Sequence, residues 1–222
     1  MKLHKETVSP VLWETLSQLM STPVFDKFCL VGGTALSLQR GHRRSIDIDL
    51  FTDVPYGTIP TNEIKDFFEK KFPIHRGAET LDEQSMGYNI ILGNGKDLPI
   101  KVDLFYTEPF IFDKKEIEGI RLADQREIIA MKMLAIGGPI HRQKDYWDVH
   151  EMLSEYGLGE MIEWGLKRNP YSLTREDIIA GFEAIDSVEE SPEGIDSLKS
   201  EDYWELKVLD LKLEIEKYKK QI

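Results

Sequence analysis

The periodicity of hydrophobic and polar residues differs between the two halves of the chain. The first half contains short apolar runs and strict alternation, most clearly where Ile46, Ile48 and Leu50 alternate with Asp47 and Asp49. Alternation with a period of two indicates a β-strand with one buried face, because successive side chains point to opposite sides. We therefore expect the three apolar residues in the core and both aspartates together on the other face.

A second alternating region, residues 86–106, predicts a β-hairpin. Residues 86–92 and 98–106 form its arms, and the glycine-rich stretch 93–96 is typical of a turn. Asp103 is an acidic residue in a largely apolar second arm. If this arm lies beside the first aspartate strand, Asp103 completes a cluster of three carboxylates; if it lies elsewhere, Asp103 faces solvent.

Apolar residues recur at helical spacing in other segments. This spacing predicts helices at 6–20, 61–72, 125–136, 142–155, 159–167, 174–185 and 203–220. Residues 186–200 are acidic, contain Pro192 and Gly194, and are expected to form a mobile linker. We therefore expect an α/β (α+β) fold: a first domain, residues 1–115, with a small mixed sheet flanked by helices, a helical second domain, residues 116–222, and an active-site cleft between them.

A glycine pair follows the apolar run Cys29–Val31 and precedes an expected helix. Gly32, Gly33 and Thr34 occupy this turn. Glycine lets the backbone approach a ligand closely, and the start of a helix presents unpaired N–H groups that attract phosphate. The stretch therefore indicates a phosphate-binding turn, to which Thr34 adds a hydroxyl group.

Two carboxylates side by side on a strand repel each other, so a fold that contains them usually places a cation between them. Mg²⁺ prefers oxygen ligands and commonly bridges carboxylates to substrate phosphates. Asp47 and Asp49, a short distance after the glycine pair, have the layout of a nucleotidyl-transfer site. The alternative is a surface strand with two solvated acids beside an ordinary turn.

The charge of the chain limits its partners. The 222 residues carry a formal net charge of −12, and residues 151–222 hold 18 acidic and 9 basic residues. A generic nucleic-acid binder carries a basic surface, so a nucleic-acid substrate would need a local patch such as His42–Arg44. With no apolar run long enough to cross a membrane, no secretory signal at the start and a single cysteine, Cys29, we expect a cytoplasmic protein.

Two stretches of the first half resemble the nucleotidyltransferase superfamily that shares the polymerase-beta catalytic core. They are Gly32–Thr34 and Arg43–Asp49, which ends in D-x-D. The lysine-bearing segment Arg126–Ile136 and the K-D-x-x-D segment Lys144–His150 are similar to the AbiEii/AbiGii branch of abortive-infection toxins. The resemblance covers residues 24–155 and implies a polymerase-beta-like nucleotidyltransferase core followed by a helical C-terminal region.

The resemblance implies a role for each of the acidic residues. Asp47 and Asp49 would hold Mg²⁺, or Mn²⁺ in its place. Asp103 would be the third metal ligand and would help to take the proton of the attacking group. Asp145 and Asp148 share one helix face, because they are three residues apart; the resemblance assigns Asp145 to catalysis and Asp148 to nucleotide binding. Asp145 could instead form an ordinary surface ion pair with Lys144.

The resemblance also implies a set of nucleotide-binding residues: Gly32, Gly33, Thr34, Arg43, Ser45, Lys132 and Asp148. Lys132, which the resemblance also assigns to catalysis, would direct its charge at the nucleotide phosphates, or it could extend to solvent from a half-buried helix face. Arg43 could contact a phosphate or the acceptor, and Ser45 could simply cap or brace the strand.

The implied activity is a Mg²⁺-dependent transfer of a nucleoside monophosphate from an NTP to an acceptor, with RNA such as a tRNA end as the first choice. A protein hydroxyl or an aminoglycoside-like small molecule is an alternative, because the acidic second half favours a cationic acceptor. A third interpretation is an NTP-binding partner protein without turnover. The resemblance further implies a toxin of a toxin–antitoxin system that acts with a separately encoded antitoxin.

Overall fold

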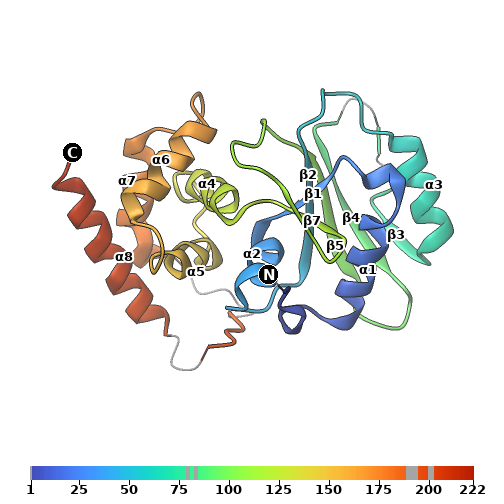
Figure 1. The fold of residues 1–222 in the computed structure, drawn as a ribbon, viewed down its shortest axis with the longest axis horizontal. Coiled ribbons are helices and arrows are strands. Elements are labelled where there is room, and N and C mark those ends of the chain that lie inside the picture. Colours follow the sequence, from blue (N-terminus) through green and yellow to red (C-terminus); the bar gives the residue numbers. More distant parts are fainter. Residues whose placement is uncertain (1, 79–80, 83–84, 189–194, 200–202) are drawn as a thin grey trace. The chain divides into compact units, whose positions relative to one another are not determined.

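The computed structural model describes residues 2–78, 81–82, 85–188, 195–199 and 203–222. The chain divides into two units, Met1–Asp124 and Gln125–Ile222 (Figure 1). The division lies nine residues beyond the predicted boundary at 115. Seven of the fifteen residues of the predicted linker, 189–194 and 200, lie outside the described residues.

A mixed β-sheet forms the centre of the first unit. In the described residues its strands lie in the order β3-β4-β5-β2-β1-β7-β6. Their bounds are β1 Cys29–Val31, β2 Asp47–Thr52, β3 Ile74–Arg76, β4 Gly87–Gly93, β5 Ile100–Tyr106, β6 Lys115–Ile117 and β7 Ile120–Leu122. The β6–β7 hairpin joins the sheet through β7, which pairs with β1, and this pairing explains why the first unit extends to Asp124.

Helices cover the sheet of the first unit. They are α1 Pro10–Met20, α2 Gly32–Arg40 and α3 Thr61–Lys71, with two short 3₁₀ helices at Lys5–Thr7 and Pro23–Phe25. In Figure 1, α2 lies on one side of the sheet and α3 on the other. The predicted helix at 6–20 is divided, because Ser9 caps α1 by accepting a hydrogen bond from the Leu12 amide at 3.1 Å. The predicted helix at 61–72 is confirmed as α3.

Strand pairing brings distant acidic residues together. Strand β2 runs parallel to β5, with Asp49 opposite Asp103 and Asp47 opposite Lys101. Strands β4 and β5 are antiparallel, which confirms the predicted hairpin. On the other edge of β2, Val31 of β1 lies opposite Asp49 and places the following glycine pair beside this aspartate.

The expected inward face of β2 is confirmed at two of its three apolar positions. Ile48 and Leu50 are fully buried, whereas Ile46 is 63% exposed. Strand β2 begins only at Asp47, so Ile46 precedes the regular alternation of the strand. The prediction that Ile46 points into the core is therefore wrong.

The second unit is helical in its described residues. Its helices are α4 Gln125–Ile136, α5 Gln143–Met152, α6 Leu158–Arg168, α7 Arg175–Glu183 and α8 Trp204–Lys219, with a 3₁₀ helix at Ala184–Ser187. Helix α7 begins with a capping box, in which the Thr174 hydroxyl accepts from the Asp177 amide and the Asp177 carboxylate accepts from the Thr174 amide. A buried ion pair between Glu127 of α4 and Arg168 of α6, 2.6 Å long, joins two of these helices.

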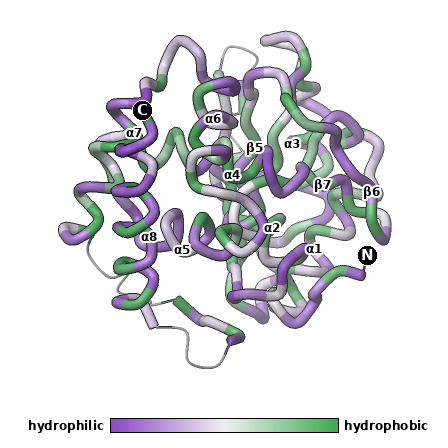
Figure 2. Tube along the Cα trace, turned by 60° about the vertical axis from the view of Figure 1, so that its left-hand side comes forward, coloured by the Kyte–Doolittle hydropathy of each residue, from purple (hydrophilic) through white to green (hydrophobic). Residues whose placement is uncertain are grey.

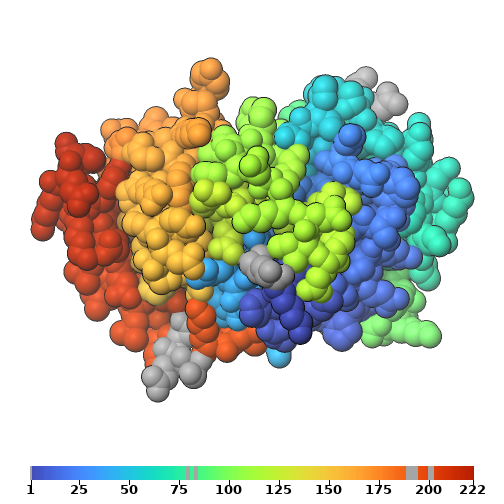
Figure 3. All heavy atoms as spheres, in the orientation of Figure 1, coloured from blue at the N-terminus to red at the C-terminus, as the bar shows by residue number. Residues whose placement is uncertain are grey.

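Helix α8 carries apolar residues on two sides. Leu211 and Ile215 are buried, while Leu206, Leu209 and Leu213 are each more than half exposed. In Figure 2, hydrophobic positions recur among hydrophilic ones along this helix, and Figure 3 shows it on the outside of its unit. None of the helices in the described part of the chain combines the length and apolar character needed to cross a membrane.

Candidate functional site

Three aspartates share one face of two neighbouring strands. Asp47 and Asp49 alternate with buried residues in β2, and both are half-buried. Asp103 lies opposite Asp49 on the parallel strand β5 and is half-buried as well. Side chains at paired positions of adjacent strands point to the same face of the sheet. The arrangement predicted for Asp103, beside the first aspartate strand, is therefore present.

Lys101 lies within this acidic face. Its Nζ donates to Oδ2 of Asp103 at 2.5 Å. Partial burial tends to lower the pKa of Lys101, but the hydrogen bond to Asp103 and the charges of Asp103, Asp47 and Asp49 outweigh it, so the pKa is raised. Oδ1 of Asp103, by contrast, is buried and finds no hydrogen-bond partner among the described residues.

The glycine pair makes room for two charged side chains. Gly32 has a φ of +69°, and a methyl group at its Cα would overlap Oδ2 of Asp49. A methyl group on Gly33 would overlap Nη2 of Arg43. Gly32 and Gly33 therefore seat a carboxylate of the acidic face and a buried guanidinium, a function that the sequence pattern alone did not indicate.

Thr34 and Ser45 connect helix α2 to the start of β2. The Thr34 side chain is fully buried, and its Oγ1 is hydrogen-bonded to Ser45 Oγ at 2.8 Å and to the backbone carbonyl of Asp47. Arg43 is 5% exposed and donates from Nη1 to the carbonyl of Arg44 at 3.0 Å. These contacts support the bracing role considered for Ser45 and extend it to Thr34. Direct contacts of Thr34, Arg43 and Ser45 with a nucleotide stay predictions.

The residues predicted in the second half form a buried ion cluster of their own. Lys132 Nζ in α4 lies 2.6 Å from Oδ1 of Asp145 and 2.9 Å from Oδ2 of Asp148, both in α5. Arg142 Nε donates to the other oxygen of Asp145 at 2.8 Å. The Lys132 side chain is 8% exposed and that of Asp145 is 1% exposed. Two alternatives are therefore wrong: Lys132 does not extend to solvent, and Asp145 does not belong to a surface pair.

The Lys132 cluster keeps the Asp145 carboxylate ionised. Burial of Asp145 tends to raise its pKa, but the charges of Lys132 and Arg142 together with the hydrogen bond from Lys132 outweigh it, so the pKa lies below its ordinary value. Asp145 and Asp148 lie on the same face of α5, as predicted, so the ammonium of Lys132 forms ion pairs with both carboxylates. The sequence did not indicate Arg142 as a third partner.

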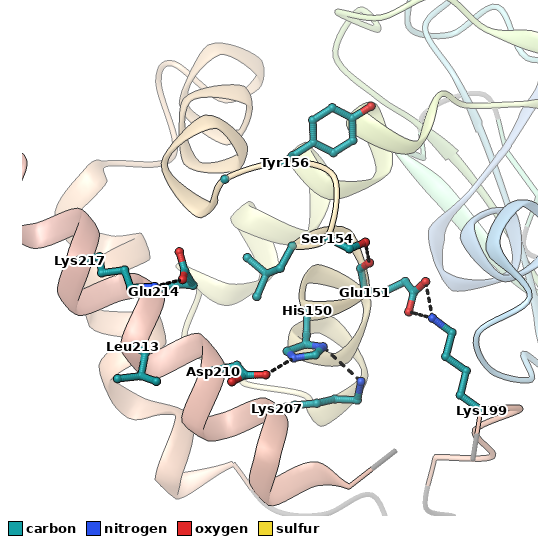
Figure 4. Close-up of a pocket in the computed structure, with 12 residues that line it drawn as sticks. His150, Glu151, Ser154, Tyr156, Lys199, Lys207, Asp210, Leu213, Glu214 and Lys217 are labelled. Atoms are coloured by element: carbon teal, nitrogen blue, oxygen red, sulfur yellow. Dashed lines mark hydrogen bonds and ion pairs between the residues drawn. The ribbon is translucent and has the colours of Figure 1, made fainter. Parts of the chain in front are cut away.

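A separate hollow in the second unit has a volume of about 520 Å³. Charged residues that line it are paired with one another (Figure 4). His150 Nε2 lies 3.0 Å from Asp210 Oδ2, and His150 Nδ1 lies 3.2 Å from Lys207 Nζ. Lys199 Nζ lies 2.5 Å from Glu151 Oε2. These contacts tie α8 and the segment before it to α5. Because the charges are matched within the hollow, we assign it a structural role.

The donor set of the acidic face suits a hard divalent cation. Carboxylate oxygens are the ligands that Mg²⁺ and Mn²⁺ prefer, and the unpartnered Oδ1 of Asp103 offers a further position for a cation. Within the described residues no group of three or more His, Cys, Asp or Glu side chains is already gathered around one point. Asp47, Asp49 and Asp103 thus fit a metal ion by chemistry and register, with the ammonium of Lys101 now on one of their oxygens.

Comparison with known proteins places these features in a family. An uncharacterized protein of Aquifex aeolicus, aq_aa25, is 28% identical over 202 residues, which cover 86% of this chain and 88% of that protein. The crystal structure of JHP933 from Helicobacter pylori is similar with a TM-score of 0.55 and 16% identity, covering 96% of each chain. A second H. pylori structure, provisionally assigned as a nucleotidyltransferase, has a TM-score of 0.52 and 16% identity, with 98% of each chain covered.

The two structural likenesses show a common fold, and the sequence itself shows the family. Residues 14–169, which include both the acidic face and the Lys132 cluster, match the model of the family described as nucleotidyl transferase AbiEii toxin, type IV TA system. The chain belongs to the AbiEii family of nucleotidyl transferase toxins.

Proposed function

We propose that the protein is a Mg²⁺-dependent nucleotidyltransferase that moves a nucleoside monophosphate from an NTP to the end of an RNA such as tRNA. The observation that carries this proposal is the register of β2 and β5, which aligns Asp49 with Asp103 beside Gly32. The metal would be held by Asp47, Asp49 and Asp103. When bound, Mg²⁺ or Mn²⁺ would compensate the triphosphate charge and lower the pKa of the attacking hydroxyl.

The chain's own residues would supply position and proton transfer. The amides at the start of α2, at Gly32 and Gly33, would hold terminal phosphates. We propose that the Asp103 carboxylate accepts the proton of the attacking hydroxyl while the oxygen of that hydroxyl forms a bond to the α-phosphorus. The bond from the α-phosphorus to the bridging oxygen breaks, and pyrophosphate leaves. Positioning and charge compensation are sufficient for chemistry of this kind.

We assign the Lys132 cluster to the same function. In the present arrangement the ammonium of Lys132 is engaged by Asp145 and Asp148. A contact with a nucleotide phosphate, as the family resemblance implies, would require one of these carboxylates to give up the lysine. We therefore propose that Lys132, Asp145 and Asp148 act as a unit that orients α4 against α5 and releases the lysine to an anionic ligand.

A different acceptor is supported by charge. Residues 151–222 hold twice as many acidic as basic residues, 18 against 9, and an acidic surface attracts cationic partners. A protein hydroxyl flanked by basic residues, or an aminoglycoside-like amine, is therefore the second candidate acceptor. In either case we place the protein in the cytoplasm and expect a separately encoded antitoxin to counteract it.

The experiment is a label-transfer assay that is resolved by acceptor. Wild type is incubated with each α-labelled NTP, Mg²⁺ and either total tRNA, a mixture of proteins or an aminoglycoside. We expect label on tRNA, loss of at least 100-fold in Asp49→Asn, and full activity in the control Asp66→Asn, which removes an exposed carboxylate from α3. Label on protein or amine would select the second acceptor. Tight NTP binding without pyrophosphate release with every acceptor would show a binding protein without turnover.

A further inference from the structure

Lys101 carries a positive charge into the acidic face of the first unit. It lies opposite Asp47 in the pairing of β5 with β2, and it is two residues before Asp103 in its own strand. Residues two apart in a strand share a face. The 2.5 Å contact of its Nζ with Oδ2 of Asp103 shows that the side chain folds back along β5 toward the carboxylates.

The surroundings of Lys101 are those of a cation site. The charges of Asp103, Asp47 and Asp49 all act on this ammonium. Three carboxylates on one face repel one another, and one positive charge among them relieves this repulsion. The lysine side chain is 44% exposed, so it can leave by rotation about its own bonds without unfolding the sheet.

Asp103 is satisfied at one oxygen and unsatisfied at the other. Oδ2 accepts from Lys101, whereas Oδ1 is buried without a hydrogen-bond partner in the described structure. A buried carboxylate oxygen without a donor is unfavourable, and a water molecule or an ion that binds there would relieve this cost. The Lys101 ammonium therefore replaces a divalent cation only in part, because it leaves Oδ1 of Asp103 without a partner.

We propose that Lys101 is a positioning residue that acts as the resident counter-cation of the metal site. Without metal it holds Asp47, Asp49 and Asp103 together, and a divalent cation must displace it from Asp103 in order to bind. This inference rests on the proposed function, because it requires a divalent cation at these carboxylates. It adds that the affinity of the site for metal is set by competition with a side chain of the protein itself.

Binding of Mn²⁺ alone, followed by electron paramagnetic resonance of the free ion, tests the competition without any substrate. Lys101→Met removes the competing charge, and we expect it to bind Mn²⁺ about tenfold more tightly than wild type. Lys101→Arg keeps the charge and should stay within about twofold of wild type. The control Lys96→Met removes the same charge from the exposed turn of the same hairpin and should leave the affinity unchanged.

Thermal unfolding provides a second measurement that does not depend on the resonance signal of the free ion. In EDTA, Lys101→Met should unfold at a lower temperature than wild type, because Asp103 loses the ammonium that contacts its Oδ2. Saturating Mn²⁺ should raise its unfolding temperature by more than it raises that of wild type. A Lys101→Gln variant should behave in the same way, which separates loss of charge from a packing defect particular to methionine.

The results distinguish the inference from the function on which it rests. If wild type and Lys101→Met bind Mn²⁺ equally, and Asp49→Asn abolishes binding to both, the metal site exists and the role of Lys101 is refuted. If Asp49→Asn leaves Mn²⁺ binding unchanged, the metal site itself is refuted and the inference fails with it. Weaker binding by Lys101→Met would show that the lysine supports the metal rather than competing with it.

Discussion

The carboxylate of Asp49 lies directly against the Cα of Gly32, at the junction between β1 and α2. Val31, the residue before this glycine, is paired with Asp49 across β1 and β2, so the contact is fixed by strand register. A side chain at position 32 would both strain the backbone, whose φ is +69°, and displace the aspartate. The glycine is thus required by the acidic face as much as by any phosphate.

Gly32→Ala is expected to lower both stability and activity. Backbone strain and overlap with Asp49 together should reduce the free energy of unfolding by about 2–5 kcal/mol. Displacement of the carboxylate should reduce label transfer about 100-fold. Chemical unfolding and the transfer assay measure these effects separately.

Gly119→Ala is the matched control for Gly32→Ala. Gly119 also has a positive φ, +77°, but no atom lies within 4 Å of the position of an added Cβ. It should therefore lose only the strain energy, about 1–2 kcal/mol, and keep full activity. Equal losses of stability in the two variants would show that the contact with Asp49 has no energetic consequence.

Gly33 and Arg43 should be energetically coupled. Gly33 has no positive φ, so Gly33→Ala affects mainly the packing of the buried Arg43 guanidinium. We expect a loss of roughly 1 kcal/mol in the free energy of unfolding, smaller than for Gly32→Ala because a long side chain can shift. In the double variant with Arg43→Ala, the loss should be smaller than the sum of the single losses by roughly 0.5–3 kcal/mol. Strict additivity in this cycle would contradict the contact.

The acidic face could be predicted largely because strand periodicity determines where side chains point. The alternation around Asp47 and Asp49 fixes their common face, and the hairpin pattern fixes that of Asp103. The parallel pairing of β2 with β5 is a long-range choice that periodicity leaves open, so Asp103 remained conditional until the register was known.

Two kinds of feature, short strands and side-chain contacts, were not predicted from the sequence, for different reasons. Strands β6 and β7 have three residues each, too few to show a period. Because these strands were not predicted, the boundary between the units was placed at 115 instead of 124. The contact of Lys101 with Asp103 and that of Arg142 with Asp145 depend on side-chain rotamers, which a residue pattern does not encode. A charged residue two or three positions from a candidate catalytic acid is the signal that would have suggested both.

Lys132→Met is expected to destabilise the second unit strongly. It leaves Asp145 and Asp148 buried without their ammonium, and breaking a buried ion pair from one side typically lowers the free energy of unfolding by about 3–5 kcal/mol. Lys114→Met is the control, because its partner Asp53 is partly exposed and the loss should be at most about 1 kcal/mol. Similar losses in both variants, measured by urea unfolding, would mean that the buried cluster contributes no more than a surface pair.

Thr34 is the residue at which a bracing role and a nucleotide-binding role predict different measurements. Thr34→Val keeps the shape of the side chain and removes the hydrogen bonds to Ser45 Oγ and the Asp47 carbonyl, so we expect a loss of about 1–3 kcal/mol in the free energy of unfolding. Thr34→Ser retains the hydroxyl and should lose less than Thr34→Val.

The kinetics of Thr34→Val complete the test. Because Thr34 supports the backbone at the start of β2, loosening it should lower kcat by shifting Asp47, while KM for the NTP stays within about twofold of wild type. A hydroxyl that held a terminal phosphate would give the reverse kinetic pattern, namely a KM raised about tenfold or more with kcat unchanged. That second pattern would show that the Thr34 side chain turns away from Ser45 and Asp47 when the nucleotide binds.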